Sequence, residues 1–273
     1  MTSSKLSWMI GLTFASLCPS GPACAADAYA AGSDNQWHFV ATPYIWLPGI
    51  YGETTLRGRT AKADASFSDL YHHTDTHVGF MGEAEAWKGD FGGFININYF
   101  DLEKDNAQAG PLTVDVSSKV LVFGFGLAYH VGDWYIGGPM DGGAGRTRRI
   151  RLDATAGGRY TNVNGGFTIV GVTDRTKDQD WVDPVIGGRA IVDLTDRVNA
   201  IVQADVGGTS SSNDFTWSAT ALLGYRFDFF GLEAHALAGY RALAQNYATG
   251  SGSQQFRWNN TMRGPILGMS VRF

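Results

Sequence analysis

Apolar and polar residues alternate along most of this chain, and the alternation is clearest in residues 215–227. Every odd-numbered position from Phe215 to Phe227 is apolar, whereas Thr216, Ser218 and Thr220 lie between them. A period of two residues places one kind of side chain on each face of a β-strand. We therefore predict a strand here with one apolar face and one polar face.

The same pattern recurs in ten segments, which predicts an antiparallel series of strands. The predicted strands are residues 37–47, 78–87, 94–102, 114–131, 150–161, 186–194, 198–206, 215–227, 232–241 and 264–273. Most are close to the 9–11 residues with which a tilted strand crosses a bilayer. Pro43 is unfavourable within the first segment, because proline cannot donate to a strand ladder.

The predicted connections alternate between long and mostly short segments. The long ones are residues 49–76, 103–112, 166–183, 207–214 and 245–255. Long loops on one side and short turns on the other are typical of a membrane barrel whose two termini lie on the short-turn side. The Gly-rich stretch 132–149 is interpreted as a loop although a short turn is expected there, so eight or twelve strands remain possible.

The chain begins with the pattern of an exported protein. Lys5 precedes the mostly apolar run 6–17, and small residues follow before Ala25, which predicts a signal peptide with cleavage after Ala25 or, as the alternative, after Ala30. The expected organisation is a signal peptide at 1–25, a short periplasmic segment at 26–36 and a transmembrane barrel at 37–273. Both cysteines, Cys18 and Cys24, fall in the signal peptide, so the mature chain is expected to have no disulfide and no thiolate metal site.

Composition and charge narrow the class of protein. Removing residues 1–25 takes away one lysine and leaves 20 basic against 26 acidic residues, which argues against a nucleic-acid partner. The chain has 36 glycines and 13% aromatic residues. No apolar stretch of membrane-spanning length follows residue 17. Because lipid leaves no partner for exposed backbone groups, strands can cross a membrane only as a closed barrel. The predicted fold class is all-β, an antiparallel up-and-down transmembrane barrel.

The signal peptide, the series of hairpins and the last strand resemble those of bacterial outer-membrane β-barrel proteins. The assembly signal of that family ends in an aromatic residue, and Phe273, Val271 and Gly268 match its pattern, whereas Leu267 departs from it. Residues 44–49 and 180–187 also look like a group of such barrels without an assigned activity. The resemblance implies a monomer in the outer membrane of a Gram-negative envelope, without a cofactor. The partners that it implies are membrane lipid, the barrel assembly machinery and periplasmic chaperones.

Charged residues on the polar faces are expected to point into the lumen. They are Glu83, Glu85, Arg151, Asp153, Arg159, Arg189, Asp193, Asp205, Arg226, Glu233 and Arg241. Acids and arginines are nearly balanced in number, and a ten-strand barrel has a small bore. Arginine and carboxylate side chains can then pair across the lumen. We predict a structural barrel with an ion-paired polar lumen, with a narrow porin-like pore for small solutes as the next hypothesis.

Other chemistry has weaker support. The cluster His72-His73-Thr74-Asp75-Thr76-His77 contains possible metal ligands, but its spacing matches no closed site, and no metal is predicted. His235 beside Glu233, and His77 near Asp75, are the histidines to consider for a barrel enzyme of the protease, deacylase or phospholipase type. Their spacing gives no convincing catalytic arrangement, so no catalytic residue is assigned. A surface-binding role rests on one acidic loop, which contains Asp174, Asp178, Asp180, Trp181 and Asp183.

Overall fold

A computed structural model describes residues 35–56, 59–66, 68, 76–109, 112–139, 147–169, 173–209 and 214–273. The predicted signal peptide lies outside these residues. The elements are β1 (Trp37–Trp46), β2 (Gly49–Leu56), β3 (Arg59–Ala65), β4 (Thr76–Lys88), β5 (Phe91–Ala109), β6 (Leu112–Pro139), β7 (Thr147–Ile169), β8 (Thr173–Asp193), β9 (Val198–Gly207), β10 (Phe215–Phe229), β11 (Leu232–Thr249), the 3-10 helix η1 (Gly252–Gln254) and β12 (Phe256–Arg272).

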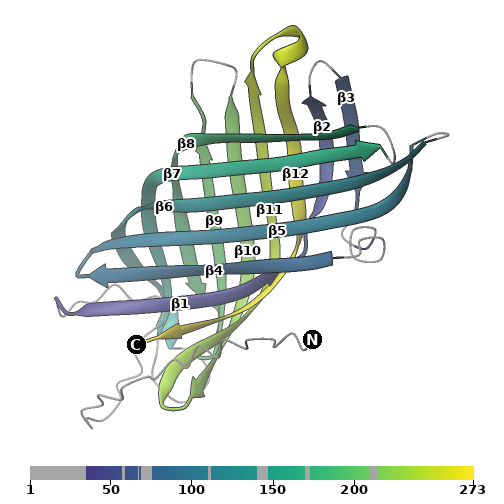
Figure 1. Cartoon of the computed structure of the whole chain (residues 1–273). Coiled ribbons are helices and arrows are strands. Elements are labelled where there is room, and N and C mark those ends of the chain that lie inside the picture. Colours follow the sequence, from purple (N-terminus) through teal and green to yellow (C-terminus); the bar gives the residue numbers. More distant parts are fainter. Residues whose placement is uncertain are drawn as a thin grey trace, which may run out of the picture.

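The strands form a closed antiparallel barrel (Figure 1). From β4 to β12 each strand pairs with the next in sequence, and β1 closes the wall by pairing with both β4 and β12. β2 continues beside β12 after β1 ends, and β3 folds back on β2, so these two strands lengthen the wall without adding a position to its circumference. The described residues therefore give ten positions around the wall, and the predicted ten-strand barrel is confirmed. No helix among the described residues is long and apolar enough to cross a membrane.

Two of the predicted long loops are wrong because the strands continue through them. The loop predicted at 103–112 is occupied by the end of β5 and the start of β6, and the loop predicted at 166–183 by the end of β7 and the start of β8. Backbone pairing persists across both hairpins. A ladder depends on backbone groups, whereas the sequence pattern depends on one face being apolar, so the pattern ends before the strands do.

The predicted loops at 49–76 and 132–149 also contain strands. The first includes the β2–β3 hairpin, and the second includes the last residues of β6 and the first of β7. The described residues thus keep ten wall positions, and within the 132–149 stretch β6 continues to Pro139 and β7 begins at Thr147 on the same side as the termini.

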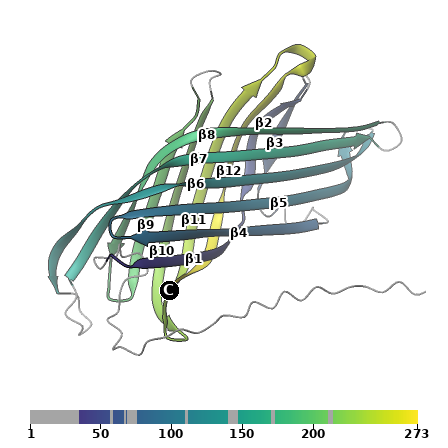
Figure 2. The same ribbon diagram turned by 60° about the vertical axis from the view of Figure 1, so that its left-hand side comes forward.

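The strands cross one another steeply on opposite sides of the barrel. Figures 1 and 2 show β4 to β8 running across β9 to β12 behind them. On the side away from the termini, the β5–β8 hairpins project separately from the group formed by β11, β12, β2 and β3 (Figures 1 and 2). On the termini side, the β10–β11 hairpin reaches beyond the C terminus in both views.

Between Pro43 and Pro48 the chain loses its pairing with β4, while its pairing with β12 passes from β1 to β2. Pairing between β1 and β4 ends at Pro43 opposite Gly82, and the N–H of Trp46 donates to Met81 Sδ at 3.2 Å instead of to a carbonyl. After Pro48 the chain follows β12, where Gly264 lies so close to Leu47 that a Cβ would overlap the Leu47 carbonyl oxygen. Glycine at 264 is therefore required by the close approach of two backbones.

A bulge in β6 changes which side chains face inward. The register with β7 shifts between His130 and Gly132, so one residue of β6 has no partner there. An extra residue of this kind re-aims the side chains after it. As a result Asp133 comes within 3.8 Å of Arg149 and 3.6 Å of His130, whereas Trp134 is 47% exposed.

Candidate functional site: the barrel interior

The interior nearer the termini is a network of buried charges centred on Arg189. Its guanidinium donates from Nη1 and Nη2 to the two carboxylate oxygens of Glu85, at 2.7 and 2.9 Å. The same guanidinium donates from Nε and Nη2 to Asp153 Oδ2, at 3.2 and 3.1 Å. All three side chains are buried. Two-point pairing of this kind is the strongest form of protein ion pair, and here it ties β4, β7 and β8 together across the lumen.

Further groups extend the network around Asp153. Arg151 donates from Nε to both Asp153 oxygens, at 2.8 and 3.1 Å, and His130 Nδ1 lies 3.1 Å from Asp153 Oδ1. The Arg151 guanidinium lies 4.9 Å from the centre of the Trp87 ring, and the Trp87 indole donates to Glu85 at 2.7 Å. Every carboxylate in this group therefore faces at least two donors, which offsets the cost of removing it from water.

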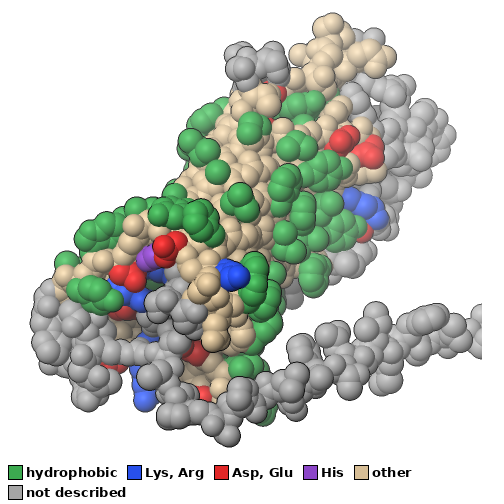
Figure 3. All heavy atoms as spheres, turned by 90° about the vertical axis from the view of Figure 1, so that its left-hand side faces the viewer, with side chains coloured by type: hydrophobic (Ala, Val, Ile, Leu, Met, Phe, Trp, Pro, Cys, Tyr) green, Lys and Arg blue, Asp and Glu red, His purple; other side chains and the backbone are tan. Residues whose placement is uncertain are grey.

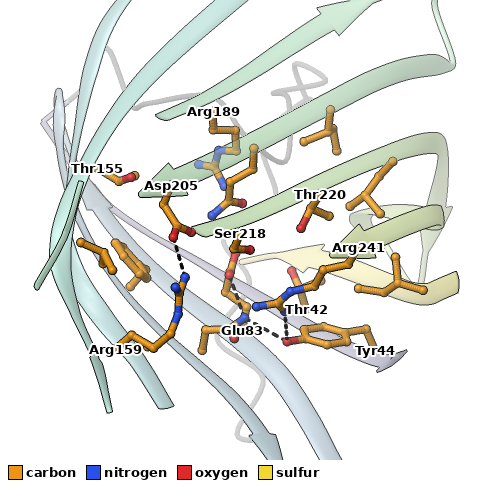
Figure 4. Close-up of a pocket in the computed structure, with 18 of the residues that line it drawn as sticks. Thr42, Tyr44, Glu83, Thr155, Arg159, Arg189, Asp205, Ser218, Thr220 and Arg241 are labelled. Carbon is orange, nitrogen blue, oxygen red and sulfur yellow. Dashed lines mark hydrogen bonds and ion pairs between the residues drawn. The ribbon is translucent and has the colours of Figure 1, made fainter. Parts of the chain in front are cut away.

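The middle of the lumen holds a cavity of about 100 Å³ between two polar groups (Figure 4). On one side, Arg159 pairs with Asp205 at 2.6 Å and donates to Thr216 at 2.8 Å. On the other, Arg241 donates to the Tyr44 hydroxyl at 3.0 Å. Ser218, Thr220 and Thr42 also line the cavity. A space of this size with polar walls can hold several water molecules or a small polar solute.

The same polar group continues from Tyr44 through two asparagines. Tyr44 donates to Asn98 at 2.8 Å, Asn98 donates to Asn96 at 2.7 Å, and Asn96 donates to Glu83 at 3.0 Å. Asn98 and Tyr44 are buried, and Arg241 lies 4.9 Å from the Trp46 ring centre. The chain of hydrogen bonds links β1, β4, β5 and β11 at mid-depth and leaves Glu83 on the cavity wall.

The half of the interior away from the termini contains a large cluster of aromatic and aliphatic side chains, together with buried polar groups such as Gln245, which donates to Thr161 at 2.7 Å. Trp181 stacks on Tyr247 with ring centres 4.4 Å apart and an angle of 3° between the planes, and Phe256 packs against both rings. The cluster that fills this half, called the apolar plug below, consists of Tyr44, Trp46, Phe100, Val120, Val122, Val163, Trp181, Leu243, Phe256, Trp258, Met262 and Ile266. The lumen therefore combines charge pairs in the half nearer the termini with the apolar plug and buried polar side chains in the other half.

The structure brings the predicted lumen residues into separate groups. Glu85, Arg151, Asp153 and Arg189 share one network, as described above. Asp193 lies 3.8 Å from Arg149 at the termini end. Arg226 pairs with Glu233 at 2.9 Å, also at this end. Arg159 and Asp205 pair, whereas Glu83 and Arg241 face the same cavity and are linked through Tyr44 and Asn96.

Of the residues considered for catalysis or metal binding, the structure describes the surroundings of His235 but not those of the His77 side chain. His235 is fully buried, with Nδ1 3.1 Å from the Asn199 amide and Nε2 3.4 Å from Glu233. His77 lies in β4, but residues 72–75 of the histidine cluster are outside the described residues. Among the described residues, no three His, Cys, Asp or Glu side chains are grouped to hold a metal ion.

The acidic segment predicted as a surface loop is part of strand β8. Trp181 and Asp183 are buried, and the Trp181 indole donates to Asp183 at 3.1 Å. Asp178 and Asp180 are exposed, and Asp178 accepts from Asn162 at 2.6 Å. The segment therefore divides its side chains between the apolar plug and the outside, so it is not a loop surface.

Comparison with known proteins adds little to this description. No protein-family model matches the chain. No curated protein matches it either. Among solved structures it is similar to the crystal structure of a major outer membrane protein from Thermus thermophilus, with 11% sequence identity over 87% of this chain and 100% of that one. The TM-score is 0.35, so no argument about function is drawn from this likeness.

Proposed function

We propose that this chain is an integral outer-membrane β-barrel with a closed lumen and a structural role. The observation that carries the proposal is the set of exposed apolar side chains on the outside of the barrel, called the apolar band below and seen on one face in Figure 3. The apolar side chains of this band that are more than 40% exposed include Ile45, Phe80, Ile95, Phe125, Leu127, Ile186, Val202, Leu223 and Leu267. Burying each from water is worth about 1.5–3 kcal/mol, and soluble monomers seldom leave a continuous apolar surface of this extent exposed.

Polar side chains limit the band on the side away from the termini. The first polar outward-facing residues there are Asp101, Lys119, Asn162, Asp180, Asn246 and Arg263. Lys119 and Asp101 form an ion pair at 2.9 Å. On β12, outward positions are apolar from Pro265 to Phe273, which agrees with the 9–11 residues of a membrane-crossing strand.

Aromatic residues gather at the other limit of the band. Trp37, Phe39 and Phe273 stack in sequence with ring centres 6.2 Å apart, and Phe91 lies 5.1 Å from Tyr129. Such aromatic girdles are typical of the two interfaces of membrane barrels. They support a position of the band within a bilayer, with the termini at one membrane surface.

The structural role is supported by the way the lumen is filled. The Arg189 network fills the half nearer the termini and the apolar plug fills much of the other half, with the cavity between them. In planar bilayers, the purified protein should give no discrete conductance steps at neutral pH. Regular steps of constant size would contradict closure and favour the second candidate, a narrow pore.

The pore hypothesis has one observation in its favour, the polar-walled cavity at mid-depth. A pore would need the plug to move, because Leu243, Met262 and Trp46 are buried between the cavity and the far end. If the lumen is a pore, the parent protein should have a measurable conductance, and replacing Leu243 and Met262 with alanine should increase it. In a closed barrel the same double variant should lose stability before any steady conductance appears.

A further inference from the structure

The tip of the β10–β11 hairpin carries an exposed aromatic residue in an unfavourable backbone conformation. Phe229 pairs with Leu232, so Phe230 and Gly231 form a two-residue turn. Phe230 has φ +54° and Gly231 has φ +81°, the pattern of a type I′ turn, where Asn-Gly is the preferred pair. The Phe230 side chain is 91% exposed. A phenylalanine at this position favours neither the turn nor solubility in water.

The surrounding residues hold this tip in a defined arrangement. The Asp228 carboxylate accepts the Gly231 N–H at 3.1 Å. The Phe230 ring meets Phe229 edge to face, with centres 4.7 Å apart, and Phe229 meets Phe227 at 6.3 Å. Residues that their neighbours hold in a strained backbone conformation are concentrated at functional sites. The three rings form one cluster, called the aromatic tip below.

The aromatic tip continues the apolar band past the neighbouring strands. The last pairing of β10 with β9 is Tyr225 with Val198, and the last pairing of β11 with β12 is Ala234 with Val271. The residues from Arg226 to Phe229 therefore extend beyond the last paired residue of β10 by roughly 9 Å along the membrane normal. This length follows from a strand rise of about 3.3 Å per residue and a strand tilt of about 45°. The headgroup layer on each side of a bilayer is about 5–8 Å thick. The overhang is therefore long enough to extend through this layer.

A basic side chain stands beside the overhang. Arg197 lies in the turn between β8 and β9, and it is exposed. Its Nη1 donates to the Tyr225 hydroxyl at 3.4 Å, and its carbonyl accepts the Arg226 N–H at 2.7 Å. Aromatic side chains favour the headgroup region, and arginine complements phosphate. Continuity with the band and this charge both point to phospholipid as the occupant.

We propose that the aromatic tip lies in the headgroup layer of the phospholipid leaflet on the termini side, with Arg197 binding a lipid phosphate. This inference rests on the proposed insertion of the barrel in a membrane. Phe227, Phe229 and Phe230 anchor the hairpin among the headgroups, and the strain at Phe230 is retained because the ring contacts lipid.

The depth of residue 230 tests the proposal. The full chain with Cys18→Ser and Cys24→Ser receives one cysteine at 230, 125 or 251, labelled with an environment-sensitive fluorophore. It is reconstituted into vesicles of phosphatidylethanolamine and phosphatidylglycerol. Phe125 faces outward within the band, and Ser251 is exposed on the hairpin at the opposite end. Quenching by aqueous iodide should be several-fold weaker at 230 than at 251.

The three positions separate failure of this inference from failure of the proposed function. Protection at 125 together with full iodide access at 230 overturns the lipid contact of the tip and leaves the membrane barrel standing. Full access at 125 removes the membrane proposal and this inference with it. A Phe230→Trp variant keeps an aromatic ring and gives a second measurement. Its added fluorescence should be quenched by lipids brominated near the headgroup, and unchanged fluorescence would count against the proposal.

The contact with Arg197 has its own test. Phosphatidylglycerol retained by the purified protein, measured by native mass spectrometry, should fall several-fold in Arg197→Gln. The matched control is Arg257→Gln, at an exposed arginine on β12 near the opposite end. Equal retention in the parent and in both variants would overturn the role of Arg197.

Discussion

Replacing Arg189 with methionine tests whether the charge network stabilises the closed barrel. Methionine keeps an unbranched apolar stem but lacks the guanidinium, so it removes all four hydrogen bonds that Arg189 makes to Glu85 and Asp153. The two carboxylates then remain buried, at 6% and 3% exposure, with one cationic partner fewer. Breaking a buried ion pair from one side costs about 3–5 kcal/mol. We expect the free energy of unfolding to fall by this amount.

Urea unfolding of the protein reconstituted in vesicles, followed by tryptophan fluorescence, measures this change. Restoring neutrality with Glu85→Gln in the Arg189→Met background should recover a large part of the loss, because Asp153 then keeps Arg151 as its cationic partner and no carboxylate is left uncompensated. As a control, Lys62→Met breaks an exposed pair with Glu53 at 3.9 Å and should change stability by less than about 1 kcal/mol. A loss below about 1 kcal/mol in Arg189→Met would refute the network's role.

Four further changes examine other parts of the structure. Gly264→Ala should reduce the yield of folded barrel, because its Cβ would overlap the Leu47 carbonyl oxygen. The control Gly93→Ala should fold normally, since its Cβ would lie 3.6 Å from the nearest atom. The resistance of each barrel to detergent at room temperature measures the yield. Leu243→Ala should lower the unfolding free energy by about 2–5 kcal/mol through a cavity in the apolar plug, and a change below this range would show that the plug is loosely packed. Phe230→Asn should raise stability in detergent micelles by up to about 1–2 kcal/mol, because asparagine tolerates a positive φ, and a loss instead would mean that the ring supports the fold. Deleting Phe273 removes two backbone hydrogen bonds to Phe39 and should reduce the amount of barrel in the outer membrane far more than it reduces the stability of refolded protein, with equal effects contradicting an assembly role.

The strand pattern in the sequence was informative wherever one face of a strand meets lipid. Outward residues such as Leu223 and Ile186 are apolar without interruption, so strand existence and facing could be predicted from alternation alone. Residues 103–106 and 173–180 are polar at every position, so alternation does not mark a strand there. This is why the ends of β5 to β8 were interpreted as loops.

The interior was harder to predict because alternation gives direction but not depth. Trp181 lies in a segment that the sequence predicts as a loop, and Phe256 and Trp258 lie between a predicted loop and the last predicted strand. Their depth in the barrel, which alternation does not give, brings them together in the plug. The pairing of Arg189 with Glu85 joins residues 104 positions apart, and no local spacing indicates it. The bulge at Gly132, which turns Asp133 inward, likewise breaks the period on which the prediction relied.

The central claim is that a closed barrel spans a lipid bilayer with its apolar plug inside. Trp217 faces outward on β10, whereas Trp258 is 5% exposed within the plug. The most direct measurement compares the parent with Trp217→Phe and Trp258→Phe in vesicles whose acyl chains carry bromine, which quenches only tryptophan in contact with lipid. We predict that the fraction of fluorescence that is quenched falls in Trp217→Phe and rises in Trp258→Phe. Fluorescence unaffected by brominated lipid in all three proteins would contradict the account.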